Sequence, residues 1–138
     1  MIEIEKLGRV MRELARDKGP FTLFGLFHRE GAPHDKWDLV VSAPWLEHGR
    51  MKALNEFVEK LSSVVRAPEI LSLSRVVRIS PDNPGLEAVL RSFPVDDGPV
   101  VVRDTTLFGL SIREAFILRA MRPPEPALSG REGGRQPD

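Results

Sequence analysis

The chain lacks cysteine altogether, and its charges balance at zero, with 20 Lys and Arg residues against 20 Asp and Glu residues. The absence of cysteine excludes a disulfide framework, a thiol nucleophile and a thiolate metal site. A balanced charge gives the molecule no overall attraction for phosphate backbones or anionic lipid. Composition therefore argues against nucleic acid and membranes as partners.

Other signatures are missing as well. No stretch approaches the ~18 consecutive apolar residues of a membrane span, and the N-terminal MIEIEKLGRV has no apolar core of a signal peptide. The sequence contains no P-loop, no G-x-G-x-x-G fingerprint and no G-x-S-x-G elbow. We therefore expect a cytoplasmic protein, and nothing in the sequence indicates an assembled catalytic set.

Three segments show helical periodicity. In residues 4–18, Leu7, Val10, Met11 and Leu14 form one apolar stripe, and Gly19-Pro20 ends the helix. Residues 48–65 carry a wider apolar stripe and are the longest predicted helix. Asp82-Asn83-Pro84 combines a capping side chain with proline at the first helical position, which predicts a helix through Phe93.

Strand patterns lie between these helices. Residues 21–28 place Phe21, Leu23, Gly25 and Phe27 on one face, and both faces are mostly apolar, so this strand should be covered on both sides. Loop 31–36 connects it to a second strand, 37–43, which we expect to pair with it in antiparallel fashion. Shorter strands are predicted at 75–80 and 99–103.

The segment from Ile112 to Met121 fits either a helix or a strand. The preceding DTTLF and Gly109 are typical of a hairpin loop, which favours a fifth strand. The resulting order, α-β-β-α-β-α-β-(β), indicates an α+β domain over residues 1–121, with a mixed sheet of four to five strands and helices packed on it. Residues 122–138 contain four prolines and three glycines and are predicted to be a disordered tail.

The histidines do not form a ligand pattern. His28, His34 and His48, together with Asp35, match no known metal-ligand spacing. His34 and His48 flank the second strand, and ~10 residues at ~3.3 Å each would separate them by roughly 30 Å. We expect no metal site there, and a histidine general base rests only on the suitable pKa of imidazole.

Asp38 is the strongest catalytic candidate. A helix and two antiparallel strands, with this aspartate opening the second, resemble the magnesium-dependent nuclease fold. That resemblance implies a second carboxylate and a lysine in an E-x-K element, but the sequence reads SAPWLE at the corresponding place. A divergent or degenerate nuclease-like enzyme that binds Mg2+ through Asp38 is thus the alternative hypothesis, beside a structural role for Asp38.

The segments FTLFGLFHRE, KWDLVVSAPWL and SLSRVVRI resemble a family of small bacterial and archaeal proteins, over roughly residues 5–120. The resemblance implies a strand pair at the end of the domain and brings no activity, cofactor or catalytic residue. The favoured hypothesis is a binding or regulatory module without catalysis or a cofactor, acting as a homodimer or on another protein. Its predicted binding residues lie in the loop and at the corner after the second strand: His34, Asp35, Trp45, Glu47 and His48.

Overall fold

The computed structural model describes residues 3–66 and 69–123, and the chain follows the predicted order of elements. The helices are α1 (Ile4–Lys18), α2 (Arg50–Val64) and α3 (Pro84–Ser92). The strands are β1 (Leu23–Arg29), β2 (Trp37–Ser42), β3 (Leu73–Arg78), β4 (Val100–Leu107) and β5 (Leu110–Ala120). The α+β prediction is therefore confirmed, and the segment that fitted either helix or strand is strand β5.

The central strand of the mixed sheet is β1, and the strand order is β3-β2-β1-β5-β4. Strand β1 pairs antiparallel with both β2 and β5, while β3 runs parallel to β2. All of β1 except its last residue is buried. Strand β1 therefore needs cover on both faces, as its two apolar faces predict.

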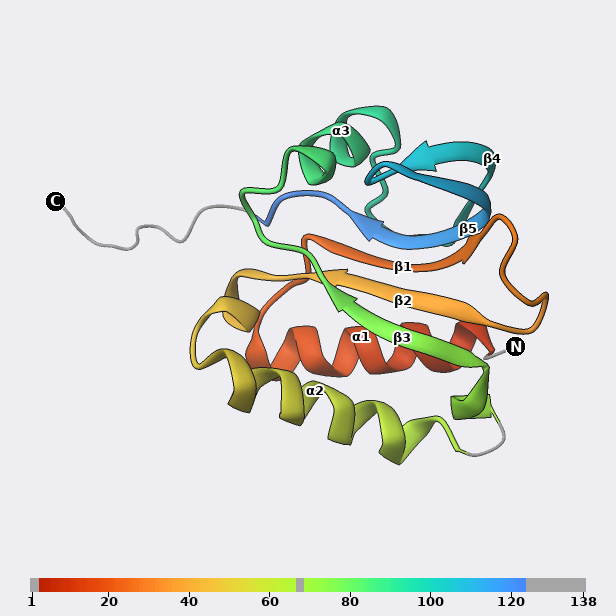
Figure 1. The fold of residues 1–138 in the computed structure, drawn as a ribbon. Helices are drawn as coiled ribbons and strands as arrows, with labels where there is room; N and C mark the ends of the chain where they lie inside the picture. Colours follow the sequence, from red (N-terminus) through yellow and green to blue (C-terminus); the bar gives the residue numbers. More distant parts are fainter. Residues whose placement is uncertain (1–2, 67–68, 124–138) are drawn as a thin grey trace, which may run out of the picture.

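Two hydrophobic cores provide that cover. Helices α1 and α2 pack on one face of the sheet, and α3 lies over the opposite face beside β4 and β5 (Figure 1). Leu7 and Leu14 of α1 and Phe57 of α2 are buried in the first core. Leu86 and Val89 of α3 are buried in the second. Both apolar faces of β1 are thus covered within one chain, by α1 and α2 on one side and by α3 on the other.

The face predicted for Phe21 is wrong. The strand begins two residues later, at Leu23, so Phe21 is free to turn towards the helices α1 and α2. There its ring packs edge-on against Phe24 at 5.0 Å and against Trp45 at 5.4 Å between ring centroids. Edge-to-face contact is the favoured geometry for such rings, and it fixes the entry into β1.

Several predicted boundaries shift. Pro44–Glu47 forms a 3-10 turn and Gly49 takes a left-handed φ of 58°, so α2 starts at Arg50. Strand β4 extends to Leu107, so the predicted loop DTTLF is mostly strand. Strand β3 starts at Leu73, earlier than expected.

At the predicted start of the tail, Arg122 donates a hydrogen bond to Glu87 of α3 at 2.7 Å. The remainder of the predicted tail, residues 124–138, lies outside the described residues. Within residues 3–66 and 69–123, no helix is both long enough and apolar enough to cross a membrane.

Candidate functional site

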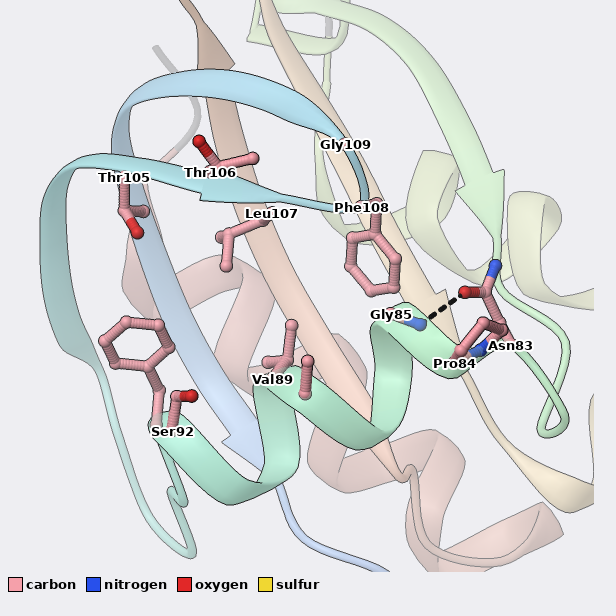
Figure 2. Close-up of a pocket in the computed structure, with 12 residues that line it drawn as sticks. Asn83, Pro84, Gly85, Val89, Ser92, Thr105, Thr106, Leu107, Phe108 and Gly109 are labelled. Atoms are coloured by element: carbon pink, nitrogen blue, oxygen red, sulfur yellow. Dashed lines mark hydrogen bonds between the residues drawn. The ribbon is translucent and has the colours of Figure 1, made fainter.

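A groove of about 530 Å³ lies between α3 and the hairpin formed by β4 and β5 (Figure 2). One wall is α3, which contributes Gly85, Val89 and Ser92, and the other wall is residues 105–109 of the hairpin. Figure 2 shows Leu107 and Phe108 pointing from the hairpin towards α3. The groove therefore has an apolar floor between a helix and a strand.

The helix wall is positioned by its first residues. Asn83 is the N-cap, and its side-chain oxygen accepts a hydrogen bond from the backbone N–H of Gly85 at 2.8 Å. Pro84 occupies the first helical position, where its missing N–H costs nothing. Leu86 and Val89 then bury one side of α3 against the sheet, which leaves Ser92 exposed at the rim of the groove.

The hairpin wall depends on an unusual turn. Phe108 and Gly109 connect β4 to β5, with φ angles of 53° and 74°. A two-residue turn with both φ values positive suits the twist of the flanking strands, but it normally uses Asn or Gly rather than a bulky residue. The backbone at Phe108 is therefore strained. Strain of this kind costs of order 1–3 kcal/mol and persists only where surrounding contacts hold it in place.

Those contacts come from two residues. The Phe108 ring stacks on Phe27 of β1, with 6.3 Å between the ring centroids. Gly85 lies on its other side, and a Cβ atom at that position would be 2.6 Å from Cδ1 of Phe108. Only glycine leaves room for the ring, so the aromatic contact of the hairpin depends on the helix start.

A second arrangement surrounds Asp38, which faces the same core as α3. Its side chain is 4% exposed, and its Oδ2 accepts a hydrogen bond from Nε of Arg29 at 2.8 Å and forms an ion pair with Nε of Arg75 at 3.2 Å. The other oxygen, Oδ1, is buried and has no hydrogen-bond partner among the described residues. We refer to Arg29, Asp38 and Arg75 as the arginine cluster.

The arginine cluster bears on the nuclease hypothesis. Two guanidinium groups lie at Oδ2, and because guanidinium stays charged at any relevant pH they repel a metal cation from this carboxylate. In the described ranges, no three His, Asp or Glu side chains are grouped so as to hold a metal ion. The surroundings of Asp38 thus favour ion pairing over metal coordination.

The histidines lie apart, as their spacing predicts. His28 is buried on the α1 and α2 side, and its ring tilts against Trp37 at 4.9 Å between centroids. Its Nδ1 is 3.0 Å from the carbonyl oxygen of Lys36, so Nδ1–H is the donor. His34 and His48 are exposed and flank opposite ends of β2.

The other predicted binding residues lie in two separate places. Asp35 is exposed in the loop beside His34. At the corner after β2, Glu47 accepts a hydrogen bond from Arg78 at 2.5 Å, and Trp45 packs on Phe21. In the part of the chain that the structure describes, neither place contributes to the groove. Sequence reasoning missed the groove, and the local signals near it are the Asn83-Pro84 helix start and Gly109 of the hairpin.

Comparison of the chain with models of protein families, with curated proteins and with solved structures finds no match. The resemblance to the family that carries the WDLVVSAPWL segment therefore stays a prediction. The groove and the arginine cluster are the features that bear on function.

Proposed function

We propose that the protein is a non-catalytic binding module whose groove accepts an extended segment of a partner polypeptide. The observation that carries this proposal is the chemistry of the lining. The polar side chains are those of Asn83, Ser92, Thr105 and Thr106, and none of the described residues that line the groove has a titratable side chain. General acid–base catalysis requires such a group at the substrate, so the lining supports binding rather than catalysis.

The position of β4 indicates the class of ligand. It is the last strand of the sheet, so one edge of its backbone has no strand partner among the described residues. An extended peptide can add to such an edge through main-chain hydrogen bonds, while alternate side chains enter the neighbouring depression. The part of β4 that lines the groove, residues 105–107, would pair with about three peptide residues, which span ~10 Å at ~3.4 Å each.

The groove also supplies the specificity that strand addition needs. Val89, Leu107 and Phe108 offer apolar contact for a peptide side chain that points inward. Ser92, Thr105 and Thr106 also line the depression, and the hydroxyl groups of Ser92 and Thr105 can hydrogen-bond to polar atoms of the peptide. We therefore expect ligands that alternate small apolar and polar residues.

The test is a selection from a library of random unstructured peptides on the full-length chain, followed by affinity measurement. A Ser92→Arg substitution places a long charged side chain in the groove and should weaken the selected peptides at least tenfold. Ser62→Arg is the matched control, because Ser62 is an exposed serine on α2 away from the groove. This control should bind like the wild type.

Peptide N-methylation tests the strand-addition geometry. Methyl groups on alternate amides of a selected peptide should abolish binding, while methyl groups on the intervening amides should have little effect, since only every second amide faces the strand. Equal affinity for Ser92→Arg and the wild type would refute the groove as the site. Failure to select any peptide would refute the ligand class.

A homodimer remains a prediction, as does the cytoplasmic location. Strand β4 exposes Val100 and Val101, which are 42% and 41% exposed, so a second copy is the competing occupant of this edge. Light scattering after size-exclusion chromatography decides between the two occupants. A dimer that Val101→Lys dissociates would favour the second copy over a partner segment.

A further inference from the structure

We propose that Arg29 and Arg75 form a binding site for the phosphate group of a free phosphate or a small phosphate ester. This site is separate from the groove and does not depend on the proposed function.

The position of the site follows from the pairing of three neighbouring strands. Asp38 on β2 pairs with Arg75 on β3 and, on its other side, with Phe27 on β1. Arg29 follows Phe27 by two residues, so its side chain points to the same face as that of Phe27. The three charged side chains thus share one face of the sheet.

The charges of the arginine cluster do not cancel. Both guanidinium groups bond to the same oxygen of Asp38, at 2.8 and 3.2 Å, so two positive charges meet one negative charge. Neither arginine has another side-chain partner among the described residues. Two like charges this close attract an additional anion, and the low polarity around a buried carboxylate strengthens that attraction.

The guanidinium groups are accessible to such an anion. The Asp38 side chain is only 4% exposed, whereas those of Arg29 and Arg75 are 36% and 50% exposed. The carboxylate therefore lies beneath and the two arginines lie above it. Arg29 donates a hydrogen bond to Asp38 through Nε and Arg75 is ion-paired with it through Nε, which leaves the terminal amino groups of both available to a ligand.

The hydrogen bonding differs from that of a pair optimised for stability alone. An arginine and a carboxylate usually form two parallel hydrogen bonds that use both oxygens. Here both arginines share Oδ2, and Oδ1 is buried without a partner in the described part of the chain. Leaving a charged oxygen unpaired is unfavourable, so the arrangement is better explained by what it presents to solvent.

A phosphate group suits two arginines better than a carboxylate does. A carboxylate has only two oxygens, so it can form a paired interaction with one guanidinium. A phosphate monoester has three terminal oxygens and can bridge two guanidinium groups at once. The arginines approach from β1 and β3, on either side of β2, which matches a bridging ligand.

The experiment titrates inorganic phosphate, glycerol 3-phosphate and acetate into the full-length chain at constant ionic strength, with binding measured by calorimetry. Saturable binding is expected for phosphate or its ester and at least tenfold weaker binding for acetate. Tighter binding of the ester than of inorganic phosphate would identify an esterified ligand, and the reverse order a free one. Arg75→Gln should weaken the phosphate-type ligand at least tenfold.

Two further variants make the outcome decisive. Arg103→Gln is the matched control, because Arg103 also bonds to one carboxylate, Glu114 at 3.1 Å, but has no second arginine there. It should leave phosphate binding unchanged. Arg75→Lys keeps the charge and removes the planar fork, so it should weaken binding by an intermediate factor. Equal effects of Arg75→Gln and Arg103→Gln, or phosphate binding no stronger than acetate binding, would overturn the proposal.

Discussion

The contact between Gly85 and Phe108 leads to a prediction in which two opposing effects can be weighed. Replacing Gly85 with Ala should raise helix propensity, an effect of up to ~1 kcal/mol in a helix interior. The added Cβ would lie 2.6 Å from Cδ1 of Phe108, so the ring has to move. Losing the stack on Phe27 and forcing the ring off its rotamer cost ~0.5–1.5 kcal/mol each. Against a gain of ~1 kcal/mol, these costs leave Gly85→Ala between neutral and ~2 kcal/mol destabilising.

Gly8 of α1 provides the matched control. A Cβ there would lie 3.0 Å from the terminal nitrogen of Arg12, the far end of a flexible side chain that can move aside. Gly8→Ala should therefore show the propensity gain alone and stabilise the protein by ~0.5–1 kcal/mol. The comparison separates the effect of backbone propensity from that of the clash.

Urea unfolding, followed by the fluorescence of the buried Trp37, measures both changes. A double-mutant cycle with Phe108→Ala isolates the coupling. Once the ring is absent, Gly85→Ala should become stabilising, which gives a coupling free energy of ~1 kcal/mol or more. If Gly85→Ala matches Gly8→Ala while Phe108 is present, or if the coupling stays below ~0.5 kcal/mol, the explanation of the groove geometry is incorrect.

Two further predictions concern charge and capping. Hydrogen bonds from Lys60 and Arg9 lower the pKa of Glu13 to about 2. Because the folded-state pKa lies below the ordinary value of ~4.3, the stabilisation is present above pH ~4.3 and disappears as the pH falls through about 2. The difference in urea midpoint between wild type and Glu13→Gln should therefore shrink over that range, and a constant difference would contradict it. Asn83→Ala should cost ~0.5–2 kcal/mol and Asn83→Gly only a few tenths, so equal losses in thermal unfolding would argue against side-chain capping.

The helices and the central strands could be predicted from the sequence, because burial sets their periodicity. Leu7, Val10 and Leu14 were placed on one stripe of a helix, and all three are buried in the structure. The two apolar faces of β1 likewise predicted cover on both sides. In each case the pattern is local and repeats over several residues, so one misplaced residue, such as Phe21, does not change the element.

The hairpin of β4 and β5 could be predicted, but the position and conformation of its turn could not, because their determinants lie elsewhere in the chain. Asp104 and Phe108 both take a φ of 53°, which is uncommon for residues with a side chain. Phe-Gly is not a turn signature, and its conformation depends on Phe27 and Gly85, which are distant in sequence. The groove is bounded by this hairpin, so it was hidden for the same reason.

Of the arginine cluster, the sequence indicates Asp38 but not its two arginine partners. Asp38 stood out as an isolated charge in an apolar strand, but its partners depend on strand pairing. Arg75 reaches it only because β3 pairs parallel to β2, in a register that no local pattern indicates. Without that register, an aspartate at the start of a strand resembles a metal ligand, whereas in the folded chain it is ion-paired with two arginines.

Both proposed ligand sites lie on the face of the sheet that α3 covers. On the face covered by α1 and α2, the buried His28 has a hydrogen-bond partner and the aromatic rings pack in favourable geometry, although Nε1 of Trp45 is buried there without a partner among the described residues. The opposite face carries both the unpaired oxygen of Asp38 and the strained backbone at Phe108. Each costs ~1–3 kcal/mol, a substantial part of the 5–15 kcal/mol that stabilises a typical domain. Phe27 lies between these two features, since it pairs with Asp38 and stacks under Phe108. Features that lower stability persist most readily where they bind a ligand, so this face is where both proposed ligands should be sought.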